Sequence, residues 1–418
     1  MKAKNEGTKC VRGRRMVAGY IYSREFQLLD LESSNKVLDS LTGNDLTTAV
    51  TARSNEHLYV LCHGLSAFKS DLGYLREALI ARGCHVLMSE CNEFTKSFKG
   101  TTECSEALVA EIIARREALG CQVKFLSIVG NSFGGIIGRV AVKMLHERDW
   151  LGLSPCNFMT IATPHLGVRF HTYIEETMGV NLPFRDQFVG LVSSMLSKSG
   201  AELLLNDTGE IKDDDLTELA GTLMYRLATE RPYLDALACF RQRRAYANLY
   251  QDSVVPLQTG GFFSSGFTAS LRERHRQESG IVAVVVTERA PAPAVGEEAE
   301  QPRYHASRDE LLGHMAASLD AIGWSKVVCH YPSLLPTAHS KLAAITRFPE
   351  FLHSGVLGFQ EGQEGMRHAA EWLLLHADEA DDIAPFAVTL NPLLPEEGKE
   401  EGMEGAEGGA IRGDVLHV

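Results

Sequence analysis

The stretch at residues 124–148 constrains the fold of this chain more than any other. It reads KFLSIVGNSFGGIIGRVAVKMLHER: an apolar run, a turn of small residues and an amphipathic segment. Residues 124–129 have the length and β-branched content of a buried parallel strand, and residues 135–146 repeat apolar side chains at helical spacing. The turn between them is a G-x-S-x-G sequence centred on Ser132. A strand, a tight turn and a helix are the setting in which such a serine acts as a nucleophile.

The motif has a simpler interpretation, because glycine and serine are common and a glycine-rich turn can carry a serine by chance. The flanking glycines have no Cβ, however, so strand and helix can approach closely around a strained turn that presents the Ser132 hydroxyl. The helix begins at the serine, and its free N–H groups and positive dipole end favour a developing oxyanion. Ser132 is therefore a candidate nucleophile whose partners must lie elsewhere in the chain.

Strand and helix patterns alternate on both sides of this turn. Further strands are expected at 57–62, 85–89, 157–162, 244–250 and 326–331, an early strand within 16–30, and helices at 71–82, 102–119 and 369–376. This alternation predicts an α/β fold with a mostly parallel sheet and helices on both faces.

The alternation also suggests how the 418 residues are organised. Residues 1–50 are expected to be a leader, and residues 51–377 the α/β domain. Residues 168–240 are either core helices or a helical cap, and we favour a cap because they follow the end of a strand, where α/β loops build binding sites. Residues 259–310 are expected to be a long insertion loop in which 281–286 is an extra strand. The acidic, glycine-rich tail at 378–418 is expected to be disordered.

Composition excludes several classes of protein. No apolar run reaches the length of a transmembrane helix, and the basic N-terminus lacks the apolar core of a signal peptide. The nine cysteines contain no CxxC pair and are interpreted as reduced core residues, so a cytoplasmic protein is expected. The formal charge of −13 argues against nucleic acid as a partner.

A serine nucleophile needs a base, and the base needs an acid that fixes its tautomer. Asp252 lies just beyond the 244–250 strand, where the acid of such a site is expected, although an aspartate there also suits a turn that ends the strand. Asp207 is the alternative, but no strand precedes it. Among the later histidines, His339 fits the base because it follows the 326–331 strand by a loop.

Two other histidines of the second half of the chain fit structural roles better. His330 lies inside a strand pattern and His314 inside a helical pattern. For the two N–H donors of an oxyanion hole, the candidates are Phe133, which follows the nucleophile, and Leu65, in the HGL turn after the first strong strand. No HExxH and no phosphate-binding GxxxxGK[ST] sequence is present, so neither a metal nor an organic cofactor is expected.

With these residues placed, the sequence resembles the putative serine esterase family of lipase-like α/β-hydrolases, formerly a domain of unknown function. The matching stretches are LYVLCHGLSAFKSDLGYL, HVLMSE, SIVGNSFGGIIGR, MTIATPHLGV, LDALACFRQRRAYANLYQDSVVP and GWSKVVCHYPSLLPTAHSKLAAI. The resemblance implies an α/β-hydrolase fold and an esterase or lipase acting on acyl esters, with relatives that handle lipids at membranes or lipid droplets. It places the nucleophile on Ser132, the acid on Asp252 and the base on His339. Lys341 departs from the pattern, because relatives tend to be apolar there.

The expected function is therefore that of a serine hydrolase, which cleaves carboxylic esters, with lipid esters as the expected substrates, through a Ser-His-Asp triad and an acyl-enzyme. The same triad serves thioesterases, peptidases and acyltransferases, and the sequence does not separate them. An inactive hydrolase-fold protein that binds lipid or a partner protein is the alternative of another class. The sequence leaves the oligomeric state open.

Overall fold

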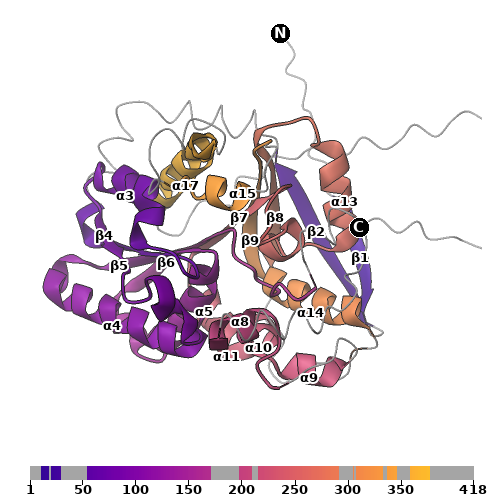
Figure 1. Ribbon diagram of the computed structural model, residues 1–418, viewed down its shortest axis with the longest axis horizontal. Coiled ribbons are helices and arrows are strands. Elements are labelled where there is room, and N and C mark those ends of the chain that lie inside the picture. The colour runs from indigo at the N-terminus through magenta and orange to yellow at the C-terminus, as the bar shows by residue number, and fades with distance from the viewer. Residues whose placement is uncertain are drawn as a thin grey trace, which may run out of the picture.

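The computed structural model describes residues 54–170, 197–209, 215–290, 305, 307–332, 337–345 and 358–376, and gives the backbone course of residues 11–17 and 20–29. A nine-stranded sheet in the order β1-β2-β8-β9-β7-β6-β5-β3-β4 runs through its centre (Figure 1). The expected leader, 1–50, lies outside the described residues apart from its two strands, and the expected tail, 378–418, lies outside them entirely.

The strands are β1 (Val11–Val17), β2 (Tyr20–Leu29), β3 (His57–Cys62), β4 (His85–Met88), β5 (Phe125–Asn131), β6 (Ser154–Ile161), β7 (Gln242–Asn248), β8 (Gly280–Arg289) and β9 (Ile322–His330). From β4 through β3, β5, β6 and β7 to β9, every neighbouring pair is parallel. Strands β8, β2 and β1 extend the sheet in antiparallel fashion. The predicted mostly parallel α/β sheet is confirmed, and parallel strands end at one common edge.

The helices that frame the sheet are α3 (Gly73–Ile80), α4 (Thr101–Leu119), α5 (Phe133–His146), α8 (Ser197–Leu203), α9 (Leu216–Gly221), α10 (Leu223–Thr229), α11 (Arg231–Ala238), α12 (Leu257–Gly260), α13 (Ser265–Arg274), α14 (Arg308–Asp320), α15 (Ala338–Leu342) and α17 (Gln363–Leu375). Short 3-10 helices include η3 (Phe94–Phe98) and η6 (Phe359–Gly362). The two faces of the sheet are covered by different helices, α3 and α17 on one side and α4, α5 and α11 on the other (Figure 1).

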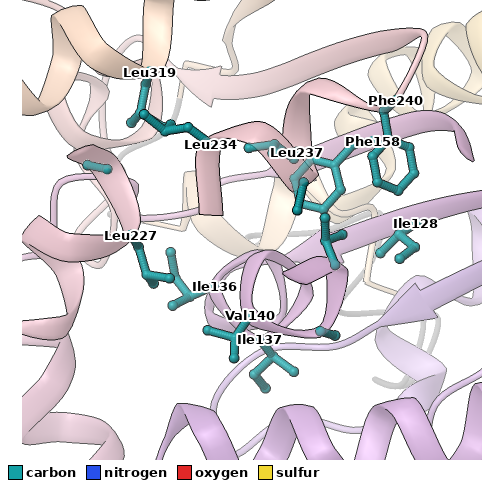
Figure 2. Packing of buried hydrophobic residues seen from close by; sticks show 14 of the residues in the cluster. Ile128, Ile136, Ile137, Val140, Phe158, Leu227, Leu234, Leu237, Phe240 and Leu319 are labelled. Atoms are coloured by element: carbon teal, nitrogen blue, oxygen red, sulfur yellow. The ribbon is translucent and has the colours of Figure 1, made fainter. Parts of the chain in front are cut away.

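Helix α5 is the centre of the larger core. Its sequence, FGGIIGRVAVKMLH, is apolar nearly all round, so it packs against the sheet on one side and against α4 and α11 on the others. Figure 2 shows Ile136 and Val140 of α5 among side chains of the sheet, such as Phe158, and of α11, such as Leu234. All four are buried, and burying side chains of this size stabilises the fold by roughly 1.5–3 kcal/mol each.

This packing corrects the expectation of a helical cap over 168–240. Helices α10 and α11 contribute Leu227, Leu234 and Leu237 to the core around α5, and α10 also packs against α14. They are core helices of the α/β domain, which is the alternative that the sequence leaves open beside a cap. The rest of the expected cap, 171–196, lies outside the described residues.

The segment 259–310, expected to be a long loop, also carries regular structure. It contains helix α13 and strand β8, which pairs with β9 along most of its length. The apolar run at 281–286 therefore belongs to the sheet, as the single strand foreseen there, although β8 extends beyond it at both ends. Much of the insertion is thus part of the domain itself, while residues 291–304 lie outside the described part.

The cysteines follow the prediction in part. Cys62, Cys84, Cys104, Cys156 and Cys329 are buried free thiols, whereas Cys121 and Cys239 are exposed rather than core residues. In the part of the chain that the structure describes, no group of three histidine, cysteine or acidic side chains is arranged to hold a metal ion. None of the described helices combines the length and apolar character that crossing a bilayer requires.

Candidate active site

Ser132 occupies the turn between β5 and α5. Its backbone has φ 54° and ψ −126°, a strained conformation for a residue with a side chain, and its N–H donates to the carbonyl of Ile161 at 2.8 Å. The hydroxyl of Thr163 donates to the carbonyl of Ser132 at 2.9 Å. Bonds from both sides therefore hold the turn that the sequence predicts.

The glycines of the motif are required by close packing. A Cβ on Gly130 would collide with the backbone of Gly135, and one on Gly134 with the carbonyls of Cys62 and His63. The missing side chains thus let α5 begin directly against the ends of β5 and β3. Gly64 does the same from the other side, because its Cβ would lie 2.9 Å from Ser132 Cβ and 3.3 Å from Ser132 Oγ.

The HGL turn therefore passes directly beside the candidate nucleophile. The carbonyl of Gly64 accepts from the Nδ1–H of His63 at 3.0 Å, and the amide of Ala67 donates to the same carbonyl at 3.4 Å. The N–H groups of Leu65 and Phe133 have no acceptor among the residues that the structure describes. Two free N–H groups beside a serine hydroxyl are what an oxyanion hole needs.

Asp252 follows β7 and is buried, with 2% of its surface exposed. Its Oδ1 accepts from the amides of Val254 at 3.0 Å and Val255 at 2.7 Å. Its Oδ2 accepts from the Asn248 side-chain amide at 2.7 Å and lies 3.1 Å from His339 Nδ1. Four donors thus hold both oxygens of one buried carboxylate in a fixed orientation.

His339 lies in the first turn of α15. A carboxylate only accepts hydrogen bonds, so the His339 Nδ1 that faces Asp252 must carry the proton, and Nε2 is left with its lone pair. Burial alone would lower the pKa of His339, but the charge of Asp252 and the hydrogen bond to it outweigh burial and raise this pKa. With 18% of its side chain exposed, the ring is held on one side and accessible on the other.

The structure joins two of the three predicted triad residues by a direct contact. The backbones of their loops also meet, because Asp252 forms an isolated antiparallel bridge with Thr337, and Ala338 donates to the carbonyl of Gln251 at 3.2 Å. Within the described part of the chain, no hydrogen bond joins Ser132 Oγ to His339. The serine follows β5, the acid follows β7 and the histidine follows β9, so all three lie at the same edge of the parallel sheet.

The alternative residues have other partners. Asp207 accepts from the amide of Leu223 at 2.9 Å and so caps the start of α10. His314 of α14 contacts the Tyr225 hydroxyl at 3.0 Å, and burial lowers its pKa to about 4. His330, at the end of β9, packs against the ring of Tyr250. These contacts give all three residues structural roles.

Sequence reasoning missed several residues that support the site. Asn248, four residues before the acid, donates to it, and its position at the end of a strand was the only available signal. Lys341, noted for its polarity, is 2% exposed and its Nζ donates to Glu361 Oε2 at 2.7 Å. This ion pair ties α15, the helix of His339, to η6.

Comparison with known proteins gives the family. The model of the family described as "Putative serine esterase (DUF676)" matches residues 52–267, more than half of the chain, a range that includes Ser132 and Asp252 but not His339. "Putative lipase ROG1" of Saccharomyces cerevisiae is 28% identical over 238 residues, covering 52% of this chain and 32% of that protein. "Putative lipase C4A8.10" of Schizosaccharomyces pombe is 24% identical over 279 residues, covering 61% and 33%. The chain spans about one third of the length of these relatives.

Solved structures of similar shape include the acylaminoacyl peptidase of Pyrococcus horikoshii, with a TM-score of 0.36 and 7% identity, covering 91% of this chain and 44% of that one. Polyneuridine aldehyde esterase has a TM-score of 0.27 and 13% identity, covering 50% and 87%. TM-scores this low do not support assigning the activity of these proteins to this chain. The order of the strands, the strained Ser132 turn after β5 and the family match agree, and the chain belongs to the putative serine esterase family, with an α/β-hydrolase fold.

Proposed function

We propose that this protein is a serine esterase or lipase that cleaves carboxylic acyl esters with Ser132 as nucleophile, His339 as base and Asp252 as the acid that orients the base. The observation that carries the proposal is the pairing of a buried, fourfold-bonded carboxylate with His339 at the sheet edge where the strained Ser132 turn lies. An aspartate that only ended the strand would not need a hydrogen bond to a histidine whose ring is exposed on its other side.

The proposed reaction has two steps. The Nε2 of His339 takes the Ser132 proton while Oγ attacks the ester carbonyl, and the amides of Leu65 and Phe133 stabilise the oxyanion. His339 then protonates the leaving alcohol, which departs and leaves an acyl-enzyme. Water, deprotonated by His339, attacks the acyl carbonyl, and collapse of the second intermediate releases the acid and restores Ser132. The chemistry requires no metal or organic cofactor.

A lipid ester is the proposed substrate class. Phe68 and Phe94 are exposed, 39% and 53%, and stack on each other at 6.0 Å between ring centroids. Phe68 lies four residues after Gly64, so the pair flanks the turn beside Ser132. Exposed aromatic rings next to a reactive serine suit contact with acyl chains or with a membrane or lipid-droplet surface.

A binding protein without turnover is the second candidate. The missing hydrogen bond between Ser132 and His339 in the described chain favours it, although catalytic hydrogen bonds are often long until substrate is bound. Such a protein would bind lipid beside Ser132 without cleaving it.

Fluorophosphonate labelling tests the proposal directly, because the probe reacts only with an activated serine. Wild type and Ser132→Ala are compared, followed by p-nitrophenyl esters of increasing chain length. We expect labelling and turnover in wild type, neither in the variant, and equal melting temperatures for both. A well-folded wild type that neither labels nor hydrolyses any ester of the series would refute the esterase proposal and favour the binding protein.

A further inference from the structure

The turn that carries Leu65 is held by a neighbouring loop with no part in the proposed triad. This loop, residues 89–98, leads from β4 into η3. Its residue Ser97 is completely buried. The Oγ of Ser97 accepts from the amide of Ser66 at 2.8 Å and donates to the carbonyl of Phe94 at 2.6 Å.

The bond from Ser66 matters because of the backbone that it holds. Ser66 has φ 53°, in the left-handed region that residues with side chains adopt at a cost of about 1–3 kcal/mol. A strained residue keeps such a conformation only where the surroundings enforce it. The buried Ser97 hydroxyl is the side-chain partner that meets the Ser66 amide.

The direction of the Leu65 N–H follows from the same turn. Leu65 N–H and Gly64 C=O share one trans peptide, so they point in opposite directions. The Gly64 carbonyl is directed by its bonds from His63 and Ala67, and Ala67 is in turn anchored through its own carbonyl, which accepts from the Phe94 amide at 3.0 Å. The anchors at Ser66 and Ala67 both come from η3, so the candidate oxyanion donor is aimed by this neighbouring loop.

Ser97 is held from its other side as well. The backbone carbonyl of Ser97 accepts from the hydroxyl of Ser199 in α8 at 2.6 Å. The Oγ of Ser199 in turn accepts from the amide of Gly100 at 2.9 Å. Ser97 is thus hydrogen-bonded through both its side chain and its backbone carbonyl. A preorganised donor of this kind stabilises a transition state without the cost of reorganisation.

We propose that Ser97 is a positioning residue for the oxyanion site: its buried hydroxyl fixes the strained Ser66 and thereby aims the Leu65 amide at the position that the substrate oxyanion occupies. This inference rests on the proposed esterase function. It predicts that loss of the hydroxyl weakens binding of the transition state and leaves binding of the ground-state ester unchanged.

The test compares Ser97→Ala with wild type in three measurements: kcat and KM for a p-nitrophenyl ester, and the inhibition constant of a matched trifluoromethyl ketone, whose adduct with Ser132 carries an oxyanion. We expect kcat to fall about 10- to 100-fold, less than the 10²–10³ that follows loss of a donor outright. The KM should stay within about twofold, and the inhibition constant should rise by the factor by which kcat/KM falls. Ser105→Ala is the matched control, because Ser105 is equally buried and bonds only to the carbonyls of Thr101 and Ile137.

Several outcomes would overturn the inference. Unchanged kcat and inhibitor binding in Ser97→Ala would do so, as would a fall in kcat without a matching rise in the inhibition constant, or an equal fall in Ser105→Ala. If Ser97→Ala does not fold, Ser97→Cys keeps the side-chain volume with a weaker hydrogen-bonding atom and must show the same linked change at smaller size. A wild type that fails to label with fluorophosphonate removes the proposed function and the inference together, whereas a labelled wild type with normal Ser97 variants removes the inference alone.

Discussion

Replacing Asp252 by Asn tests the acid–base pair with little change of shape. The asparagine oxygen can still accept from the Val254 and Val255 amides, but the charge beside His339 is lost. The amide group also presents a donor to Asn248 or to His339, where the carboxylate presented only acceptors. The variant therefore removes both the charge that stabilises an imidazolium and the partner that fixes its tautomer.

The size of the effect follows from the geometry. Asp252 Oδ2 and His339 Nδ1 are 3.1 Å apart, which places the centres of charge roughly 4 Å apart, and at an effective dielectric constant of about 20 two such charges attract by about 4 kcal/mol. That energy stabilises the protonated histidine that forms in the transition state and corresponds to about 10³ in rate. Loss of the correct tautomer adds to it, and a triad acid replaced by its amide elsewhere costs about 10⁴. We expect kcat/KM of Asp252→Asn to fall by about 10³–10⁴.

The pH dependence of activity gives an independent test, because the direction in which it shifts in the variant can be predicted. His339 must be neutral to act as a base, so wild-type kcat/KM should rise with pH through its raised pKa, with the midpoint above the 6.5 usual for histidine. In Asp252→Asn only burial remains, which lowers the pKa, so the acidic limb of the residual activity should move below 6.5. Fluorophosphonate labelling rates from pH 5 to 9 measure the acidic limb of the wild type and that of Asp252→Asn. In the folded wild type the raised pKa also means that His339 adds stability below pH 6.5, and this stability is lost as the pH rises through the folded-state pKa.

Asp207→Asn is the control, because Asp207 is the other candidate aspartate and its partner is the Leu223 amide at the start of α10. It should keep wild-type turnover. The reasoning fails if Asp252→Asn retains more than a tenth of wild-type kcat/KM while folded, or if its acidic limb moves to higher pH. A comparable loss in Asp207→Asn would return that residue to consideration as the acid.

Three further changes have defined outcomes. Gly64→Ala places a Cβ 2.9 Å from Ser132 Cβ, so fluorophosphonate labelling should slow at least about tenfold with the fold kept, as circular dichroism would check. Glu361→Ala removes the carboxylate partner of the buried Lys341 ammonium and should cost about 1–3 kcal/mol in urea unfolding, whereas Lys341→Met should be near neutral; equal costs would contradict this. Burial raises the pKa of Glu202, so its charge costs stability as pH rises through that pKa, and Glu202→Gln should gain more stability at pH 7 than at pH 4 in thermal unfolding.

Much of the fold could be predicted because local patterns specify it. Strand β3 is found at the predicted residues, 57–62, and α4 begins one residue before its predicted start at 102. The turn that carries Ser132 was predictable for the same reason, since strand, turn and helix are contiguous in the chain. The surface on which a helix packs depends on residues far away in the sequence, so a local pattern does not specify it. The amphipathic residues of α11 suit a cap and a core layer equally, and only the contact with α5 decides between them.

The acid and the base show where local patterns stop and long-range contacts begin. Each could be ranked by its place after a strand, but nothing near Asp252 specifies that residues 337–338 bridge to its loop, or that Glu361 anchors α15 through Lys341. The insertion between acid and base does not loosen this arrangement, because β8 and α13 take up much of it and β8 pairs directly with β9, the strand that precedes His339. A flexible loop of that length would not by itself fix the position of His339 relative to Asp252. An added strand in the sheet, a backbone bridge and the ion pair of Lys341 with Glu361 hold the histidine loop at separate points. A change at any one of them should therefore alter catalysis through the position of His339 and leave the chemistry of Ser132 itself intact.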